Sequence, residues 1–386
     1  MSPHGAGSTA SDEILKPENK WEGMRMTKMN DSETLGVGLR RRDVLRRGGY
    51  SAVGVMLALA TGRGALAQNA GPSLGNIKAN LSTLRYGEIS PNYADAWPTT
   101  IGTVKGYFKE VGISNMKATM TEEYVAGLVS NSLDMTHSDT DKALSAAVAS
   151  NMPIKIIGCF RQRERWILAA RKGINTSADL KGKKVSGGAL DGHNTWVLKQ
   201  ILIKMGLDPN KDVEIVPMTG ASNTRQMAVI TGTVDAAVLF PRHRAGVEDA
   251  GGKFVHDELV PAPSEAVIAL EPWLATNKDT AIAWMVADIR ARQWLFDPAN
   301  KDEAYKIMRD AGYEIPPAFE AQYKEELDVI SPDGGFDSAE VMDTFIAELK
   351  EAGDISAKVN WRDHIDLKYL WAAQDALGLP RRPASL

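Results

Sequence analysis

The sequence has little of the residue types on which covalent cross-links, metal centres and many hydrolytic sites depend. It holds one cysteine, Cys159, and six histidines among 386 residues. A single cysteine excludes an intramolecular disulfide and a cysteine-cluster metal site. The common zinc-protease, serine-hydrolase and thiol-redox patterns are absent as well. We therefore expect a protein that is not an enzyme, with no catalytic residues, no metal and no cofactor.

Long apolar runs and a strong positive charge are also missing. No run is long enough to span a bilayer permanently. Residues 1–67 hold 10 Lys and Arg against 7 Asp and Glu, which leaves 35 against 42 for the remainder. An acidic body of this kind argues against a nucleic-acid partner.

The N-terminal residues carry the features of an export signal. The arginine-rich segment 40–46 is followed by an apolar run over 50–60 and by Ala65-Leu66-Ala67, a small-x-small cleavage site. The arginines with Val44 and Leu45 resemble a twin-arginine signal, although Asp43 leaves general secretion open. A basic solvated arm and an uncleaved anchor are the alternatives. We expect cleavage after Ala67, no lipid anchor, and a soluble mature chain in the periplasm.

What the chain does contain is one repeated theme, seen best in residues 178–217. Residues 184–187 predict a buried strand, 188–194 a loop of small residues, and 195–205 an amphipathic helix. A loop that leaves a strand and opens a helix presents unpaired backbone N–H groups. The glycines of this loop are out of phase with the dinucleotide-binding pattern, which excludes that reading.

The same alternation of strands and helices occurs on both sides of this unit. Strands are predicted over 84–89, 116–120, 133–136, 154–159, 166–170, 184–187, 213–217, 236–240 and 266–270. A helix that ends at Val129 is predicted after the caps Thr121 and Glu122. The other helices are predicted over 97–111, 141–149, 195–205, 222–231, 280–296, 301–311, 338–350 and 365–377.

Such an order indicates an α/β protein with mostly parallel strands, enough of them for two sheets. The charged segment 161–165 is predicted to link two strands, and 241–244 to close the second series. The C-terminal helices should pack back on the first lobe, so that two segments, near 171–176 and 260–264, cross between the lobes. Ligands of open α/β sheets sit beyond the carboxyl ends of the strands. We expect the loops at these strand ends to form two half-sites that face each other across a cleft.

Four short segments in order carry a family resemblance: 179–185 (DLKGKKV), 204–209 (KMGLDP), 213–216 (VEIV) and 232–236 (GTVDA). Over residues 82–275 the chain resembles the solute-binding proteins of nitrate/sulfonate/taurine-type ABC transporters. The resemblance implies a two-lobed type II periplasmic binding protein fold, with a ligand cleft between the lobes and a helical C-terminal tail packed on lobe 1. The boundaries are 1–67 for the signal peptide, 79–171 and 263–386 for lobe 1, and 172–262 for lobe 2.

The implied role is capture of a small organic anion, such as a sulfonate or carboxylate, or of a zwitterion. A monomeric binding protein would deliver it to an ABC permease with its ATPase. Two alternatives stay open: an enzyme of the same fold acting on a small heterocycle or carboxylate, and a binding protein that feeds a membrane sensor. In the enzyme alternative, His137 beside Asp139 could act as a base.

The candidate ligand-binding residues are polar side chains on strand-end loops. They are Ser90, Asn92, Tyr93, Glu122, Ser138, Asp139, Thr140, His193, Asn194, Thr195, Ser222, Asn223 and Arg242. Helix capping is the alternative role for several of the hydroxyl and amide side chains. Arg242 could pair bidentately with an anion. The arginines within 161–165 could face the mouth of the cleft, although a run of charges is more often a solvated face. Trp97 and Trp196 read as core residues rather than as aromatic contacts for a ligand.

Overall fold

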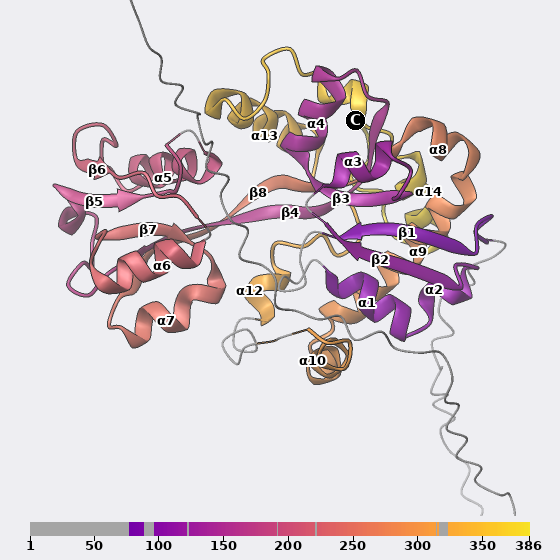
Figure 1. The fold of residues 1–386 in the computed structure, drawn as a ribbon, viewed down its shortest axis with the longest axis horizontal. Coiled ribbons are helices and arrows are strands. Elements are labelled where there is room, and N and C mark those ends of the chain that lie inside the picture. Colours follow the sequence, from indigo (N-terminus) through magenta and orange to yellow (C-terminus); the bar gives the residue numbers. More distant parts are fainter. Residues whose placement is uncertain are drawn as a thin grey trace, which may run out of the picture. The chain divides into compact units, whose positions relative to one another are not determined.

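The structure is a computed structural model, and it describes residues 77–88, 96–121, 123–190, 192–220, 222–313, 315 and 323–386 (Figure 1). All of these belong to Ala67–Leu386, one of two units into which the chain divides. The predicted export signal lies outside the described residues, as do Ser90, Asn92, Tyr93 and Glu122. Among the described helices, none combines the length and the apolar character that a membrane crossing requires.

The described residues include eight strands in one mixed sheet, ordered β2-β1-β3-β8-β4-β7-β5-β6. β1 pairs in parallel with β2 and β3, and β5 pairs in parallel with β6 and β7. β4 and β8 are antiparallel to each other and run between the two groups (Figure 1). The bounds are β1 Thr83–Glu88, β2 Asn115–Met120, β3 Met135–Asp139, β4 Ile154–Ala170, β5 Lys183–Ser186, β6 Val213–Ile215, β7 Ala236–Leu239 and β8 Lys253–Leu270.

The two long strands correct the sequence prediction. β4 is one strand of 17 residues, so segment 161–165 is not a link between two strands, and β8 begins well before residue 266. The reason is cross-strand charge pairing. Nε of Arg161 lies 2.8 Å from Glu265, and Nε of Arg165 lies 2.6 Å from Asp257. The first pair is directly opposite in the register and the second is diagonal. Cross-strand ion pairs of this kind let charged residues occupy the ladder, and the two predicted sheets become one.

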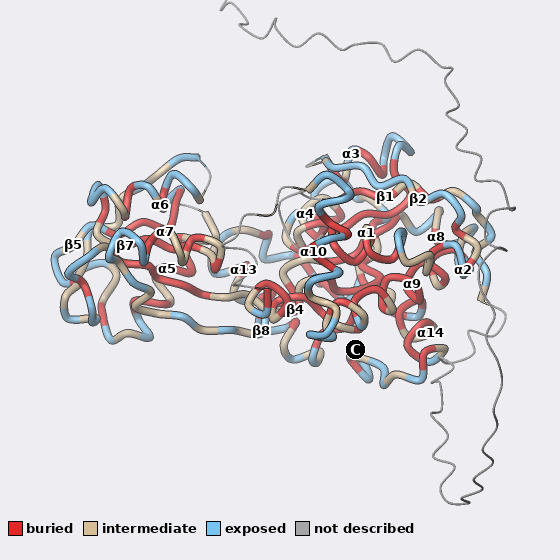
Figure 2. The backbone as a smooth tube through the Cα atoms, turned by 90° about the horizontal axis from the view of Figure 1, so that it is seen from below, coloured by how far each residue is buried: buried red, intermediate tan, exposed pale blue. Residues whose placement is uncertain are grey.

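A large hydrophobic core surrounds β1, β3 and the adjoining parts of β4 and β8. Its central element is α9, which is buried along most of its length, including Trp284 and Ile289 (Figure 2). The helices at this core are α1 Trp97–Val104, α2 Tyr107–Glu110, α3 Tyr124–Val129, α4 Thr140–Ala149, α8 Glu271–Thr276, α9 Lys278–Phe296, α10 Lys301–Asp310, α12 Tyr323–Leu327, α13 Ala339–Ala352 and α14 Lys368–Ala376. The C-terminal helices therefore pack on the first strand group, and the buried positions of Trp97 and Trp196 confirm the core assignment of both residues.

Glycine explains one further difference from the prediction. The single helix predicted over 97–111 is divided into α1 and α2 at Gly106, whose φ is +80°. This left-handed conformation costs glycine little, because it has no Cβ.

A smaller core is formed around β5, β6 and β7, and it includes Trp166, Leu198 and Val238. α5 His193–Lys204 packs on this face of the strands. α6 Ser222–Thr231 and α7 Arg244–Asp249 pack on the other face, in a second cluster that includes Ala237 and Leu239. The two clusters together are called the small core. α7 is preceded by a 3-10 turn over Pro241–His243, so residues 241–244 start a helix that the sequence analysis did not predict. The domain boundaries themselves stay a prediction.

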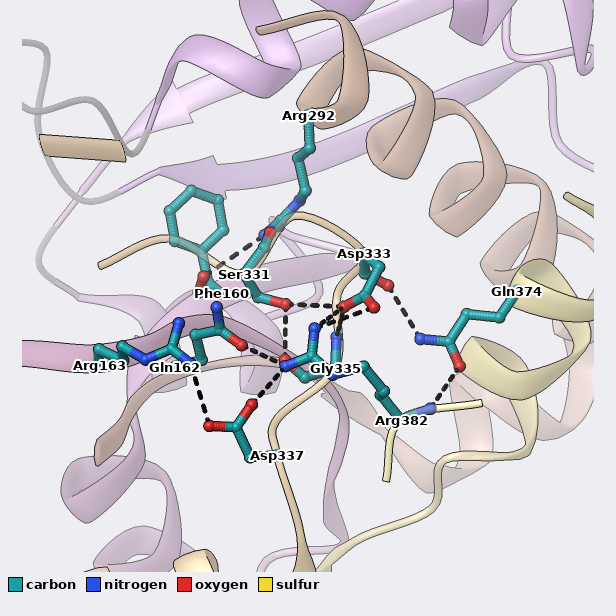
Figure 3. A network of polar contacts seen from close by, with 10 residues as sticks. All are labelled: Phe160, Gln162, Arg163, Arg292, Ser331, Asp333, Gly335, Asp337, Gln374 and Arg382. Carbon is teal, nitrogen blue, oxygen red and sulfur yellow. Dashed lines mark hydrogen bonds and ion pairs between the residues drawn. The ribbon is translucent and has the colours of Figure 1, made fainter. Parts of the chain in front are cut away.

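The C-terminal tail is fixed to β4 by a polar network (Figure 3). Arg382 pairs with Asp333 at 3.0 Å and with Asp337 at 2.8 Å, and it also donates to the amide oxygen of Gln162 on β4. Arg163, one residue further along β4, donates to Asp337 at 3.2 Å. The segment that leads into α13 is thereby held against the large-core half of β4.

Candidate functional site

A cavity of about 220 Å³ lies where the two cores meet along β4 and β8. Trp166 and Val238 of the small core and Val329 of the large core contribute to its wall. The remaining lining is mostly polar and charged, with three apolar residues. It consists of Asp139, Arg161, Glu164, Arg165, His193, Asn194, Val197, Phe240, Pro241, Arg242, Ser264, Glu265, Glu325 and Glu326.

Arg242 forms the basic end of the cavity. It follows Phe240 beyond the end of β7, and its guanidinium lies 4.4 Å above the Phe240 ring. Nη2 of Arg242 donates to Oγ of Ser222 at 3.1 Å, which places the guanidinium at the N-terminus of α6. A helix N-terminus and a guanidinium both attract anions. This end of the cavity is therefore suited to a negatively charged group.

A second arginine, Arg225, supports this end from within the small core. Its side chain is buried, and Nε donates to the carbonyl oxygen of Val238 at 3.0 Å. Burial lowers the pKa of Arg225, and the nearby positive charge of Arg242 lowers it further. Arg225 was not predicted, since an arginine inside an amphipathic helix gives no signal of burial in the sequence.

His243 and Asn223 hold the backbone around Arg242. Nδ1 of His243 accepts from the Phe240 N–H at 3.1 Å, and Nε2 lies 3.1 Å from Oδ1 of Asn223. Burial, with the charge of Arg242, lowers the pKa of His243 to about 3. The neutral ring then donates to Asn223 through Nε2–H. Asn223, a predicted ligand residue, is engaged in this contact.

His193 begins α5 and lies between two carboxylates. Nε2 is 3.1 Å from Oε2 of Glu164 on β4, and Nδ1 is 3.2 Å from Oδ2 of Asp354. Burial alone would lower the pKa of His193, but the hydrogen bonds and charges of Glu164 and Asp354 outweigh it and raise the pKa to about 9. The imidazolium stacks on Trp196 with ring centroids 5.8 Å apart. His193 is therefore a fixed cation at the cavity wall.

Only Asp139 of the predicted group at the end of β3 reaches the cavity. It pairs with Lys142 at 2.6 Å and does not cap α4 with its side chain. Ser138 and Thr140 are buried, and their hydroxyls donate to the carbonyl oxygens of Asp139 and Pro263.

The nine predicted residues that the structure describes separate into three groups. Four of them line one cavity: Asp139, His193, Asn194 and Arg242. Four hold neighbouring side chains or backbone: Ser138, Thr140, Ser222 and Asn223. Thr195 is also buried, and its hydroxyl donates to the carbonyl oxygen of Ala189 at 2.6 Å.

The main residues missed are the paired charges of β4 and β8. Arg161, Arg165 and Glu265 line the cavity, so for two of the arginines the cleft mouth, and not a solvated face, is the position that the structure shows. The arginines at 161, 163 and 165 are two residues apart, which is the spacing of side chains on one face of a strand. This spacing could have predicted that they lie on the same face of a sheet.

The cavity offers neither a metal site nor an activated thiol within the described residues. No group of three or more His, Cys, Asp or Glu there could hold a metal ion. Cys159 is buried, and burial raises the pKa of its thiol.

Comparison with known proteins decides the family. The model of the NMT1/THI5-like family matches residues 94–299, which is more than half of the chain. The chain belongs to this family. The resemblance found in the sequence is thereby confirmed, because curated relatives include the nitrate/nitrite binding protein NrtA of Nostoc.

The curated relatives are distant. NrtA of Nostoc is 20% identical over 71% of this chain and 70% of its own length. The candidate binding protein YtlA of Bacillus subtilis is 27% identical over 53% of this chain, and the match spans 64% of the YtlA length.

Solved structures show the same fold. The periplasmic nitrate-binding protein NrtA from Synechocystis gives a TM-score of 0.60 at 16% identity and covers 79% of this chain and 93% of that protein. The aliphatic sulphonate binding protein SsuA from Escherichia coli gives 0.58 at 18% identity, covering 75% of this chain and 99% of SsuA. The predicted two-lobed periplasmic binding protein fold is confirmed by these neighbours.

Proposed function

We propose that the protein is the substrate-binding component of an ABC importer and captures a small organic anion in the cavity between its two cores. The observation that carries this is the basic end of the cavity, where Arg242 and Ser222 meet at the N-terminus of α6. A relative named for nitrate binding and a solved structure named for sulphonate binding support a small anion as the ligand. Export to the periplasm, cleavage after Ala67 and delivery to a permease belong to this proposal.

The size of the cavity favours an organic ligand over a bare oxyanion. About 220 Å³ corresponds to several water molecules at about 30 Å³ each, so nitrate alone would leave most of the space to solvent. Trp166, Val238 and Phe240 offer apolar wall beside the charged end. A sulfonate or carboxylate with an apolar body would use both.

Three carboxylates in the cavity lining, Asp139, Glu325 and Glu326, keep a zwitterion within the proposal. An ammonium or other donor group on the ligand would face them while the acid group faces Arg242. A binding protein that feeds a membrane sensor would use the same cavity, so the choice between permease and sensor depends on the partner.

The enzyme alternative has weaker support. His137, its proposed base, is fully buried, and burial lowers its pKa. The ring stacks on Phe160 at 4.2 Å and is not among the residues that line the cavity. Turnover of a bound ligand that is lost on changing His137 to Ala would favour this alternative.

A ligand screen with the purified mature chain tests the proposal. Thermal shift and calorimetry against sulfonates, carboxylates, nitrate, cations and neutral sugars should find an organic anion that raises the melting temperature at micromolar concentration. Arg242→Ala should weaken that ligand by about 2 kcal/mol, or roughly 30-fold, and Arg242→Lys by less. Arg381→Ala, which removes an exposed pair with Asp375, is the control. Stabilisation by cations or sugars alone would refute the anion assignment.

A further inference from the structure

Helix α13 contacts both hydrophobic cores, although it lies far along the chain from the small one. Met342, Phe345 and Leu349 on one face belong to the large core. Ala352 in the last turn packs against the small core, and the helix ends beside the start of α5 (Figure 1). α13 is therefore a connection between the two cores in addition to β4 and β8.

The N-terminal end of α13 is fixed on the large-core side. Asp337, two residues before the helix, pairs with Arg163 at 3.2 Å and with Arg382 at 2.8 Å (Figure 3). Ser338 caps the helix by accepting from the Val341 N–H at 3.3 Å. Because these contacts include β4 itself, the start of α13 must follow any movement of the large-core half of that strand.

The C-terminal end of α13 is fixed on the small-core side through Asp354. Gly353 has a φ of +86°, and the Asp354 N–H donates to the carbonyl oxygen of Leu349 at 2.9 Å. This helix-ending turn points the Asp354 carboxylate at Nδ1 of His193, 3.2 Å away. The other ring nitrogen faces Glu164, so the two nitrogens can both donate only if the ring is charged.

The groups around this pair are mostly acidic. Glu348 faces it from α13, and Asp141 faces Asp354 from α4. Lys204 on α5 and Arg161 on β4 supply the nearby positive charge. In such surroundings an imidazolium held by Glu164 and Asp354 helps to offset the negative charge where the two cores meet.

We propose that α13 is a strap across the two cores and that the His193–Asp354 pair is its latch, which limits how far the cores separate when the cavity opens. The strap goes beyond the proposed function, because it restrains opening whichever ligand the cavity takes. Its mechanical basis is that α13 packs on the large core while Asp354 is held to the start of α5 in the small core, so opening must stretch the pair or unwind the last turn of α13.

Small-angle X-ray scattering of the full mature chain without added ligand tests this proposal. Asp354→Asn and His193→Gln should each increase the radius of gyration, and the double variant should increase it no further than either change alone. His193→Arg, which keeps a cation for Asp354, should restore most of the compaction. Asp375→Asn, at an exposed pair on the C-terminal segment, should leave the scattering unchanged.

Equal radii for wild type, Asp354→Asn and His193→Gln would overturn the latch. Hydrogen exchange of the unmodified chain gives a second measurement that needs no variant. The amides at the end of α13 and at the start of α5 should show the same opening free energy, because the latch joins them. Markedly different protection at the two ends would contradict the proposal even if every variant failed to fold.

Discussion

Nε of Arg292 lies 2.6 Å from a carboxylate oxygen of Asp288, one turn away on α9, and neither side chain is exposed. Nη1 of Arg292 also donates to the carbonyl oxygen of Ser331 at 2.8 Å, and the guanidinium covers the Phe160 ring. Burial raises the pKa of Asp288, which Arg292 opposes. The pair therefore joins α9 to β4 and to the segment before α13 through two charged side chains that are buried away from solvent.

Removing one member of this pair should destabilise the protein strongly. Asp288→Ala leaves a buried guanidinium without its counter-charge, and the expected loss in the free energy of unfolding is about 3–5 kcal/mol. The double change of Asp288 to Leu and Arg292 to Met should lose much less, because no charge stays buried. Urea denaturation of the three proteins measures this. A double variant as unstable as Asp288→Ala would show that the arginine contacts themselves carry the stability.

The His193 site should make stability depend on pH above neutrality. Because its folded pKa is raised from 6.5 to about 9, its contribution is fully present below about pH 6.5 and is lost as pH rises through about 9. The loss should be on the order of 2 kcal/mol, since the side chain is 29% exposed and partly screened. Denaturation at pH 6, 8 and 10 measures it. In His193→Gln the slope over this interval should disappear, and a slope that survives must come from other groups.

Much of the fold follows from sequence patterns, and the exceptions have physical causes. Alternating strands and helices, such as α6 over Ser222–Thr231, were predicted at their observed positions because apolar spacing determines which face is buried. The sequence predicts β4 as two strands because Arg161 and Arg165, considered without their cross-strand partners, are typical of a loop. Their partners, Glu265 and Asp257, are about a hundred residues away in sequence, and only the antiparallel pairing of β4 with β8 brings Glu265 opposite Arg161 and Asp257 diagonally across from Arg165.

The candidate site shows the same limit. Arg242 and His193 are predicted as candidates because they follow a strand or begin a helix, positions that lie at a cleft in this topology, and both line the cavity. Asp354 could not be found in this way. It lies after a C-terminal helix, and nothing in the local sequence indicates that the helix reaches α5.

The export route is a prediction that a pair of conservative substitutions can test. If the arginines of the N-terminal segment act as a twin-arginine signal, changing both Arg41 and Arg42 to Lys should abolish export. The reason is that the twin-arginine export machinery recognises the two arginine side chains themselves and not only their positive charge. A general secretion signal needs only positive charge and should still work. Fractionation of cells that express the full chain measures this, and N-terminal sequencing of the exported form checks cleavage after Ala67. Undiminished export of the lysine variant would assign the chain to general secretion.

Gly187, at the end of β5, should tolerate no side chain. A Cβ at this position would lie 2.5 Å from the carbonyl oxygen of Asn194 and 2.6 Å from the backbone nitrogen of Thr195, so the strand end and the first turn of α5 would have to move apart. Crowding of this kind costs about 1–3 kcal/mol, and since His193 and Asn194 line the cavity, ligand affinity should fall as well. Gly192→Ala is the matched control, because its φ is −89° and a Cβ there would meet Ala189 at ordinary contact distances of 3.4 and 3.6 Å. Equal melting temperatures and equal affinities for the two alanine variants would mean that the loop adjusts without moving α5. In that case the close packing of the end of β5 on α5 does not determine the position of His193.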